Sequence, residues 1–399
     1  MWWASVEKRS LLSLLIFAHF TNDIYNFVLP PLLVVMKYKF DISYFEGGML
    51  VALYLLVSGL AQTPVARFSE KHGVQKQALL IGFLGMALTM VYFAFSSNFP
   101  DFLVGSLLLG LSLAPYHPQG IGAISVAFDS KERGSAVGLH QFGGNVGMFA
   151  APLIVAALFS VVKLTWSEAM LVITIPALIA VIFIAALFQA PKQVISDEPK
   201  EKSNKWRLAL LSPIILLALA YALNAVSTRA FSSFTPSYLD SVTSNLGLSE
   251  GLTSFVIASG MIAFPLGGYI SDKLGRKSVI IVSYGLAGLF FLLYSLIGGV
   301  LALPLLFAAF FFGYIGSAPA LAYASELGKN GRANSSVAVV FGAGTIGNAI
   351  GPFMVGPLID FMGFIPAFRI MAIFAIMAAI PIILIEGHKR KALFSGEQA

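Results

Sequence analysis

Four polar side chains interrupt the first long apolar stretch of the chain: His19, Asn22, Asp23 and Asn26. Their i, i+3, i+4, i+7 spacing places them on one face of a helix, so a helix here would carry a polar stripe. A buried carboxylate can load and release a proton, and an imidazole one turn away can share it. We therefore expect the stripe to line a solute path, with Asp23 and His19 coupling protons. Asn22 and Asn26 are candidate substrate contacts.

The composition around Asp23 is that of a membrane protein. The chain has 399 residues, of which 58% are hydrophobic and 11% charged, whereas soluble domains carry about 25% charged residues. Apolar runs of about 20 residues, long enough to cross a bilayer as helices, recur along the sequence. Because a charge at mid-membrane costs ~2.5–3.5 kcal/mol on insertion scales, Asp23 needs a partner or a wet cavity. The alternative to proton coupling is a structural Asp23, hydrogen-bonded to Asn22 or to a neighbouring helix.

Twelve membrane spans are predicted. Most Lys and Arg residues then fall in loops on the side of the N-terminus, which the positive-inside rule assigns to the cytoplasm. We expect a multi-pass protein of the inner (cytoplasmic) membrane with both termini in the cytoplasm, and the net charge of +6 then requires no nucleic-acid partner. The absence of cysteine excludes disulfides. The predicted spans are residues 11–35, 44–66, 78–96, 101–126, 135–160, 166–189, 208–234, 252–270, 278–298, 301–325, 335–358 and 364–385.

The spans divide six and six. The polar segment 191–207 has the composition of a flexible cytoplasmic linker between residues 1–190 and residues 208–399, the second of which ends in a short cytoplasmic tail. The halves also repeat each other, since Ser69–Gly73 after span 2 corresponds to Ser271–Gly275 after span 8. Parallel repeats of this kind are one of the architectures of transporters, with the site at the midplane between the halves.

The segment from Gly268 to Lys277 reads Gly-Tyr-Ile-Ser-Asp-Lys-Leu-Gly-Arg-Lys. It matches the cytoplasmic-loop signature Gly-x-x-x-Asp-Arg/Lys-x-Gly-Arg-Arg/Lys of the major facilitator superfamily at every defining position. The first copy, residues 66–76, is degenerate, with Glu70 in place of Asp. Together with the spans, the linker and the repeat, this loop makes the chain resemble that superfamily. The resemblance implies an all-α membrane protein with twelve transmembrane helices in two pseudo-symmetric six-helix bundles.

The resemblance also gives this loop a gating role. Asp272 can accept hydrogen bonds from a neighbouring helix N-terminus and can pair with Arg276 or another basic residue. Such a pair would latch the inner ends of the two halves in one state and break in the other. Gly268 and Gly275 complete the signature, and Glu70 is expected to act more weakly in the first half. The alternative is a charged turn that only fixes the topology.

Three further segments resemble the fosmidomycin-resistance branch, a group of proton-driven exporters. They are His19-Phe20-x-Asn22-Asp23 in span 1, Tyr116-His117-Pro118 in span 4 and Gln141-x-Gly143-Gly144-Asn145-x-Gly147 in span 5. One departure concerns Gln119, which stands where the branch usually carries Glu. A role of that Glu in proton or substrate binding therefore does not transfer to this chain.

The fourth and fifth spans supply further site candidates. His117 lies between Pro115 and Pro118, whose missing backbone donors loosen the helix and free carbonyl groups. It either takes part in protonation or substrate binding, or it satisfies one of those carbonyls. Gln119, Gln141 and Asn145 are candidate substrate contacts. On another face, the small residues Gly143, Gly147 and Ala151 allow a neighbouring helix to approach closely.

The second half offers its own candidates in spans 7 and 11. Tyr221 and Asn224 share a helix face, and Asn224 occupies the position in the repeat that Asp23 holds in the first half. Arg229 could attract an anionic group of a substrate, or it could snorkel to the outer membrane interface. Asn348 is a further cavity candidate.

The sequence contains none of the common enzyme motifs. The sequence has no phosphate-binding loop, no nucleophile elbow and no metal-ligand spacing, so we expect no enzyme activity, cofactor or metal. The first hypothesis is a monomeric, proton-coupled exporter of a small anionic or amphipathic compound that works by alternating access in the lipid bilayer. An uptake symporter or facilitator for a sugar or organic anion is the alternative. A non-transporting receptor or scaffold is the third.

Overall fold

The computed structural model describes residues 6–189, 213–328 and 333–385. Within these ranges the chain forms helices joined by short turns, and no strand is present among them. The described residues contain twelve helices that are long and apolar enough to cross a membrane, which confirms the predicted number of spans. The expected linker at 191–207 and the C-terminal tail from residue 386 lie outside the described residues.

The first half contains eight α-helices and one π-helical turn. They are α1 (Val6–Phe27), α2 (Leu29–Phe40), α3 (Tyr44–His72), α4 (Gln75–Phe95), α5 (Phe99–Leu113), α6 (Tyr116–Ala127), α7 (Ser130–Ala156), the π-helical η1 (Ala157–Val161) and α8 (Trp166–Leu187). The second half has the same order of spans. It comprises α9 (Pro213–Thr243), α10 (Leu246–Ile257), α11 (Ser259–Leu274), α12 (Arg276–Ile297), the 3-10 turn η2 (Val300–Ala302), α13 (Leu303–Ile315), α14 (Ser317–Leu327), α15 (Ala333–Met362) and α16 (Phe364–Leu384).

Four spans are interrupted within the membrane-spanning stretch. The first breaks just before Pro30 and Pro31, and the fourth breaks at Pro115, because proline lacks the backbone N–H that continues a helix. The eighth and tenth break at Ala258 and Gly316. The breaks in spans 4 and 10 occupy equivalent places in the two halves, as the internal repeat predicts. The break at Pro115 places the following residues in the first turn of a new helix, α6.

The seventh span is longer than predicted. The expected end was residue 234, but α9 continues to Thr243. The predicted end was too early, and the helix continues because the polar side chains beyond it are buried against neighbouring helices. Some of them, such as Thr235, donate their hydroxyl to a carbonyl of the same helix. The buried polar residues are Ser232, Ser233, Thr235, Ser237 and Asp240.

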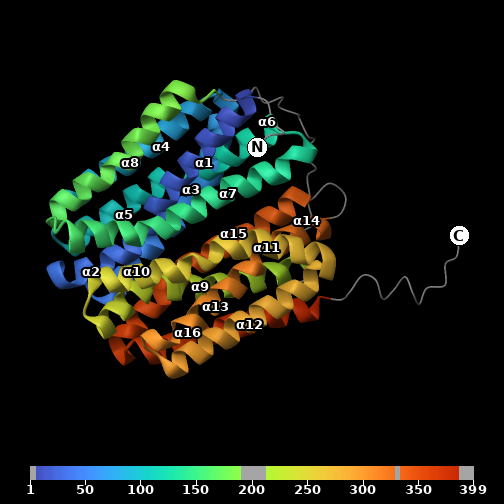
Figure 1. Ribbon diagram of the computed structural model, residues 1–399. Helices are drawn as coiled ribbons and strands as arrows, with labels where there is room; N and C mark the ends of the chain where they lie inside the picture. The colour runs from blue at the N-terminus through green and yellow to red at the C-terminus, as the bar shows by residue number, and fades with distance from the viewer. Residues whose placement is uncertain (1–5, 190–212, 329–332, 386–399) are drawn as a thin grey trace, which may run out of the picture.

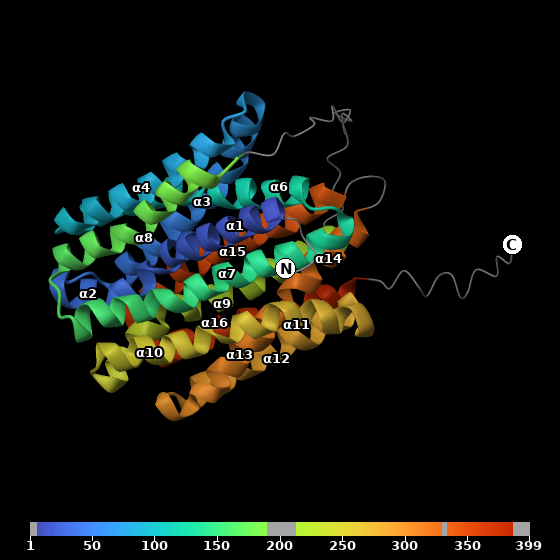
Figure 2. The ribbon, with the colours of Figure 1, turned by 45° about the horizontal axis from the view of Figure 1, so that its top comes forward.

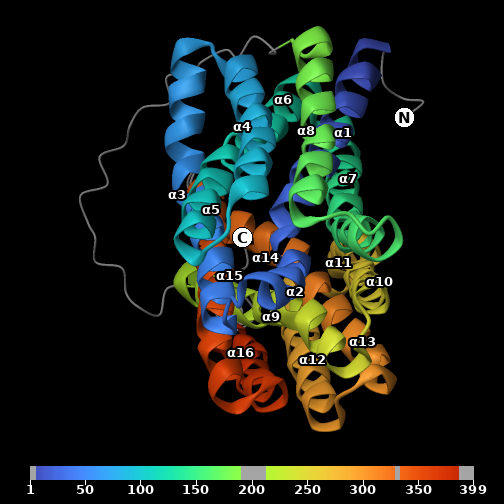
Figure 3. The ribbon, with the colours of Figure 1, turned by 90° about the vertical axis from the view of Figure 1, so that its left-hand side faces the viewer.

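The two halves lie side by side as separate bundles, the first coloured blue to green and the second yellow to red (Figures 1 and 3). Across the boundary, α3 packs along α15, and α7 packs along α10. Within the halves, the most extensive contacts of α1 are with α7, and those of α9 are with α15. Because α1 and α9 are each packed inside their half, their polar faces are held away from lipid.

Small residues bring these helices together, as the sequence predicts. A Cβ atom at Gly143 would lie 2.7 Å from the Ile16 carbonyl oxygen of α1, and one at Gly147 would overlap the carbonyl of Phe20. In the second half, Gly351 of α15 meets the backbone of α9 in the same way. The two glycine stripes therefore set the close approach of α7 to α1 and of α15 to α9.

The described chain ends, Val6 and Ile385, lie at one end of the molecule, called the terminal end. The opposite end, called the distal end, holds the turns at residues 41–43, 162–165 and 363, and α2 and α10 lie towards it (Figure 2). Polar contacts join the two halves at the distal end. The Asp360 carboxylate of α15 accepts hydrogen bonds from the backbone N–H groups of Tyr44 and Phe45 at 3.1 and 2.7 Å.

A second polar contact at the distal end lies between α2 and α9. The Tyr38 hydroxyl donates to Asp240 Oδ2 at 2.9 Å. Aromatic rings support this closure, since the ring centroids of Tyr44 and Phe364 lie 4.9 Å apart. The halves are therefore held together at the distal end by contacts that are both polar and apolar.

Candidate functional site

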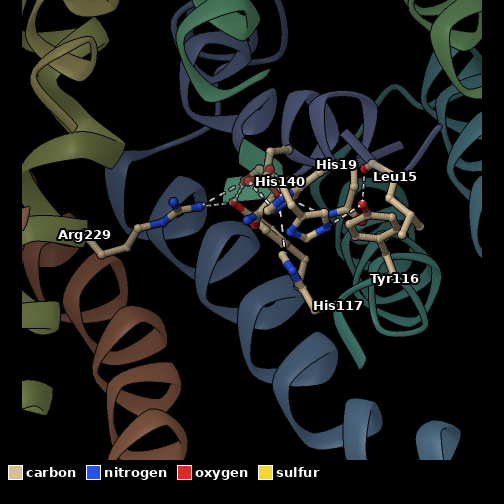
Figure 4. Close-up of polar contacts among 10 residues, drawn as sticks. Leu15, His19, Tyr116, His117, His140 and Arg229 are labelled. Atoms are coloured by element: carbon tan, nitrogen blue, oxygen red, sulfur yellow. Dashed lines mark hydrogen bonds and ion pairs between the residues drawn. The ribbon is translucent and has the colours of Figure 1, made fainter. Parts of the chain in front are cut away.

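Three helices of the first half bring their polar side chains to one place (Figure 4). His19 and Asp23 come from α1, His117 from the first turn of α6, and His140 from α7. The glycine contact between α7 and α1 and the break before α6 create this meeting point. Sequence spacing alone placed His117 in a different span from His19 and Asp23. The structure brings all three predicted proton-coupling residues together.

The Asp23 carboxylate lies at the centre of this group. His19 Nε2 is 3.3 Å from its Oδ2, and His117 Nε2 is 3.9 Å from its Oδ1. Asn22 Nδ2 also donates to Asp23 Oδ1 at 2.9 Å. The side chains of His19 and Asp23 are 2% and 9% exposed, whereas that of His117 is 30% exposed. Both predicted settings of Asp23, an imidazole partner and an Asn22 hydrogen bond, therefore occur at once.

The tautomer of His19 follows from its second hydrogen bond. His19 Nδ1 lies 2.8 Å from the backbone carbonyl oxygen of His140. Since a carbonyl oxygen can only accept, Nδ1 carries a proton and donates it. A neutral imidazole would then turn its Nε2 lone pair towards the Asp23 carboxylate. The lone pair and the negatively charged carboxylate would repel each other. A further proton between Nε2 and Oδ2 removes this repulsion, so the geometry of the His19–Asp23 pair is that of a proton-sharing pair.

His140 and Tyr116 fix the other side of His19. The Tyr116 hydroxyl donates to the Leu15 carbonyl at 2.6 Å and lies 2.9 Å from His140 Nε2. Because that hydroxyl proton is already used, His140 Nε2 is the donor. The centroids of the His19 and His140 rings lie 4.2 Å apart. Neither His140 nor Tyr116 was among the predicted site residues, although each adjoins a predicted one in the sequence.

Gly144 of α7 provides the space for the His19–Asp23 pair. A Cβ atom at this position would lie 2.5 Å from His19 Nε2 and 2.6 Å from Asp23 Oδ2. Any side chain here would press between the two groups. Position 144 therefore requires glycine because α7 approaches the His19–Asp23 pair closely here. This glycine acts in addition to Gly143 and Gly147, which pack α7 against α1.

Arg229 of α9 reaches the site from the second half (Figure 4). It is 7% exposed, and its Nη2 donates to the Asn26 carbonyl at 3.0 Å and to the Tyr54 hydroxyl. Its guanidinium lies 5.0 Å from the centroid of the Phe27 ring. In the described part of the chain no carboxylate lies within ion-pair distance of it. Snorkelling to the membrane surface was the wrong alternative, because α9 continues well past Arg229 and the side chain turns inward.

The remaining predicted substrate contacts are dispersed. Gln119 is buried and donates to Ser69 Oγ of α3 at 2.9 Å, so it ties α6 to α3. Asn224 is buried and donates to the Gly313 carbonyl at 3.4 Å, while its Oδ1 has no partner among the described residues. Gln141 is exposed, and the partly buried residues are Asn26, Asn145, Tyr221 and Asn348.

The predicted latch at the terminal end does not link the halves in this structure. Asp272 is paired with Arg276 at 2.5 Å, and Arg276 Nε lies 3.2 Å from Glu326 Oε1. All three residues belong to the second half. Gly275 of the same loop has a φ of 89°, in the left-handed region that favours glycine, and the backbone carbonyl of Gly268 accepts a long hydrogen bond from Arg276. Glu70 is exposed.

Known proteins resemble the chain over most of its length. The sequence profile described as Major Facilitator Superfamily matches residues 15–352 and again residues 241–398. The chain is 24% identical over 380 residues to the uncharacterized MFS-type transporter YfnC of Bacillus subtilis (strain 168), which covers 93% of this chain and 91% of the relative. It is 23% identical over 275 residues to the fosmidomycin resistance protein of Escherichia coli (strain K12), covering 66% of this chain and 65% of that protein.

Solved structures show the same fold. A bacterial homolog of the human lysosomal transporter Spinster, in an inward-facing and occupied conformation, superposes with a TM-score of 0.78 at 16% identity. The superposition covers 96% of this chain and 97% of that one. At this identity the likeness concerns the fold alone. The arrangement of twelve helices in two bundles is therefore that of known transporters.

Proposed function

The chain belongs to the major facilitator superfamily of multi-pass membrane transporters, and we propose that within it the protein is a proton-coupled exporter of a small anionic or amphipathic compound. Members of this superfamily are transporters and not enzymes. We further propose that the protein is a monomer in the inner membrane, with the terminal end in the cytoplasm because most Lys and Arg residues lie in loops there.

The observation that supports proton coupling is the fixed ring of His19. Its Nδ1–H is held by the His140 carbonyl, so its Nε2 must face Asp23. In a dry site this arrangement favours one additional proton on the His19–Asp23 pair. When the site fills with water, the carboxylate regains its hydration and the pair can release that proton. The partly exposed His117 offers a route between the pair and water.

The support for an anionic substrate group is Arg229. Its positive charge is buried between the halves without a carboxylate partner in the described part of the chain, although a buried charge is normally paired. It contacts Asn26, which lies one turn beyond Asp23 on α1. A solute anion could pair with Arg229 while the first half holds the proton site. Proton and substrate would then bind on opposite sides of the same boundary.

The distal contacts support the mechanism of alternating access. The bonds of Asp360 to α3 and of Tyr38 to Asp240 hold the halves together at the distal end. The latch expected at the terminal end joins residues of one half only. With the terminal end in the cytoplasm, this state faces inward. Transport would then proceed by rocking the halves about the site, which opens the distal end and closes the terminal end.

The test is proton movement in proteoliposomes that contain a pH-sensitive dye, with a panel of candidate solutes added. We expect substrate-dependent proton flux with the wild type and loss of that flux with Asp23→Asn. The matched control is Asp41→Asn, an exposed turn residue whose left-handed φ of 53° asparagine also tolerates. Substrate transport without proton flux, unchanged in Asp23→Asn, would instead identify a facilitator.

The direction of transport is measured separately. Under an imposed inward proton gradient, an exporter expels the labelled solute, whereas a symporter accumulates it. Accumulation would replace the proposed exporter with the uptake symporter. A lack of flux for every solute, in protein that is folded and correctly inserted, would support the non-transporting receptor.

A further inference from the structure

Glu250 is a buried carboxyl group that the site does not use. The predicted eighth span began at residue 252, which assigned Glu250 to an outer loop, but α10 begins at Leu246 and places it inside the span. Its side chain is fully buried, and neither carboxyl oxygen has a hydrogen-bond partner among the described residues. An ionised carboxylate in such a place would have a large desolvation cost. Glu250 is therefore neutral in this structure.

Glu250 faces the boundary between the two halves. Gly247 and Ser254 lie three residues before it and four after it, so all three share one face of α10. A Cβ atom at Gly247 would lie 3.3 Å from Ser160 Cβ of η1, and Ser254 Oγ donates to the Phe149 carbonyl of α7 at 3.0 Å. Both contacts cross to the first half. We call the surface where α10 meets α7 and η1 the distal seam.

The charges around Glu250 favour its neutral form. Asp240 of α9 is buried and acts on Glu250 by charge repulsion. The other titratable groups of α9 point elsewhere: Arg229 contacts the first half, the Tyr238 hydroxyl accepts a hydrogen bond from the backbone N–H of Gly299, and Tyr221 lies against Gly344. In the described part of the chain no cation is paired with Glu250.

The other elements packed against α10 bring no counter-charge to this level. The end of α7, residues 149–156, and η1 contain no titratable side chain. On α13, Tyr314 lies against Gly260, beyond the end of α10. On α11, Asp272 and Lys273 lie at the terminal end. Asp240 therefore acts on Glu250 with a charge of the same sign. Lys39 of α2 lines a pocket with Asp240 and Leu246, but it is exposed and is not paired with Glu250.

We propose that Glu250 is a proton-operated lock of the distal seam: its carboxyl group must be protonated for the two halves to close at the distal end. When the distal seam opens, water reaches Glu250, and a hydrated glutamate is ionised near neutral pH. When the seam closes, the group must take up a proton from the distal side. The lock rests on the rocking motion of the proposed function and is independent of which group drives transport.

The sign of the pH effect follows from this difference in bound protons. The closed form holds one proton more than the open form, so acidification favours closure. One linked proton changes the ratio of closed to open molecules by up to about tenfold per pH unit. The proton bound at closure returns to the distal side on opening. Glu250 therefore controls the conformational equilibrium without carrying a proton across the membrane.

The test measures the distance across the distal end as a function of pH. The sequence has no cysteine, so Phe95→Cys and Leu301→Cys introduce the only two labelling sites, one in each half and both strongly exposed. Electron–electron distance measurement on this pair, in the purified full chain, gives the fractions of open and closed molecules. We expect acidification to increase the closed fraction. Glu250→Gln, which mimics the protonated side chain, should favour closure at every pH. It should also lower the pH slope, defined as the change in the logarithm of the closed-to-open ratio per pH unit, by about one proton.

Two comparisons make this result specific. Glu168→Gln changes an exposed glutamate at the same end, in the capping box of α8, and should keep the wild-type slope. Infrared difference spectra should show a protonated carboxyl band in the closed form that Glu250→Gln lacks. An unchanged pH slope in Glu250→Gln, or a closed form whose Glu250 is ionised in the infrared spectrum, would overturn the lock.

The same measurements separate the lock from the proposed proton coupling. Asp23→Asn should keep the part of the pH slope that Glu250→Gln removes. If Asp23→Asn leaves proton flux intact but Glu250→Gln lowers the slope, the proposed coupling is wrong and the lock stands. If Asp23→Asn abolishes proton flux and Glu250→Gln does not alter the slope, the lock is wrong and the coupling stands.

Discussion

The Asp360 carboxylate accepts a hydrogen bond of 2.7 Å from the backbone N–H of Phe45, across the boundary between the two halves. It also accepts one from Tyr44, so it caps the first turn of α3. An anion at this position compensates the positive end of the helix dipole. The predicted role of Asp272, a carboxylate that holds the N-terminus of a neighbouring helix, is thus performed at the opposite end by a residue that no signature indicated.

Asp360→Asn should shift the protein towards the form that is open at the distal end. Asparagine keeps one acceptor but loses the charge, and a charge at a helix N-terminus contributes about 0.3–1 kcal/mol, up to ~2 kcal/mol when partly buried. The label pair at positions 95 and 301 measures the shift. Asp101→Asn is the matched control, since Asp101 lies in the first turn of α5 and its contacts stay within the first half. Equal effects of the two variants would show that Asp360 does not close the distal end.

Tyr116→Phe should destabilise the protein and loosen His140. The lost hydroxyl leaves His140 Nε2–H without its acceptor in a buried place, which costs about 1–3 kcal/mol. Thermal unfolding in detergent measures the loss. Tyr92→Phe, which alters a partly buried tyrosine of the same half, should unfold near the wild-type temperature. A Tyr116→Phe protein as stable as the wild type would mean that the hydroxyl does not support His140.

The sequence predicted the parts of the fold that depend on local periodicity. Apolar runs predicted the twelve spans, the polar spacing on α1 predicted the His19–Asp23 stripe, and the glycine spacing predicted a close helix contact of α7, without identifying α1 as its partner. Each of these follows from the geometry of one helix. They were recoverable because a helix places residues three and four apart on one face, whatever surrounds it.

The missing parts depend on how helices cross. His140 joins the site because α7 crosses α1 at the level of His19, and no spacing within α7 shows this. Glu250 and the polar end of α9 looked like loop residues, because a polar side chain near the end of an apolar run indicates the membrane surface unless neighbouring helices cover it. Arg229 lies inside the protein because α9 continues past it, which places its side chain away from the membrane surface.

Gly144→Ala should abolish substrate-dependent proton flux without preventing folding. The new methyl group would lie 2.5 Å from His19 Nε2, and the bond of Nδ1 to the His140 carbonyl restricts the ring from moving away. Overpacking of this kind typically costs about 1–3 kcal/mol, so the His19–Asp23 contact should give way first. The measurement is the pH-dye assay in proteoliposomes, alongside thermal unfolding.

The control for Gly144→Ala lies on the same helix. A Cβ atom at Gly138 would meet nothing within 4 Å, so Gly138→Ala should transport as the wild type does. It should be at least as stable, because alanine favours a helix over glycine by about 0.8–1.0 kcal/mol. Wild-type proton flux in Gly144→Ala would contradict the role of the His19–Asp23 pair.

Arg229→Gln should weaken the binding of anionic solutes and spare neutral ones. A hydrogen bond to a charged group contributes about 1.5–3 kcal/mol, so the KM of an anionic substrate should rise roughly tenfold or more. Arg229→Lys keeps the charge but not the planar set of donors that reaches the Asn26 carbonyl and the Tyr54 hydroxyl. Its KM for the anionic solute should therefore lie between those of the wild type and Arg229→Gln. The comparison uses transport kinetics of an anionic solute and its neutral ester. Arg369→Gln, an exposed arginine of α16 that donates to the Ser295 carbonyl at 3.1 Å, should change neither KM. Equal increases in KM for the anion and the ester in Arg229→Gln would assign Arg229 to the packing of the two halves, because a lost anion contact cannot affect a neutral solute.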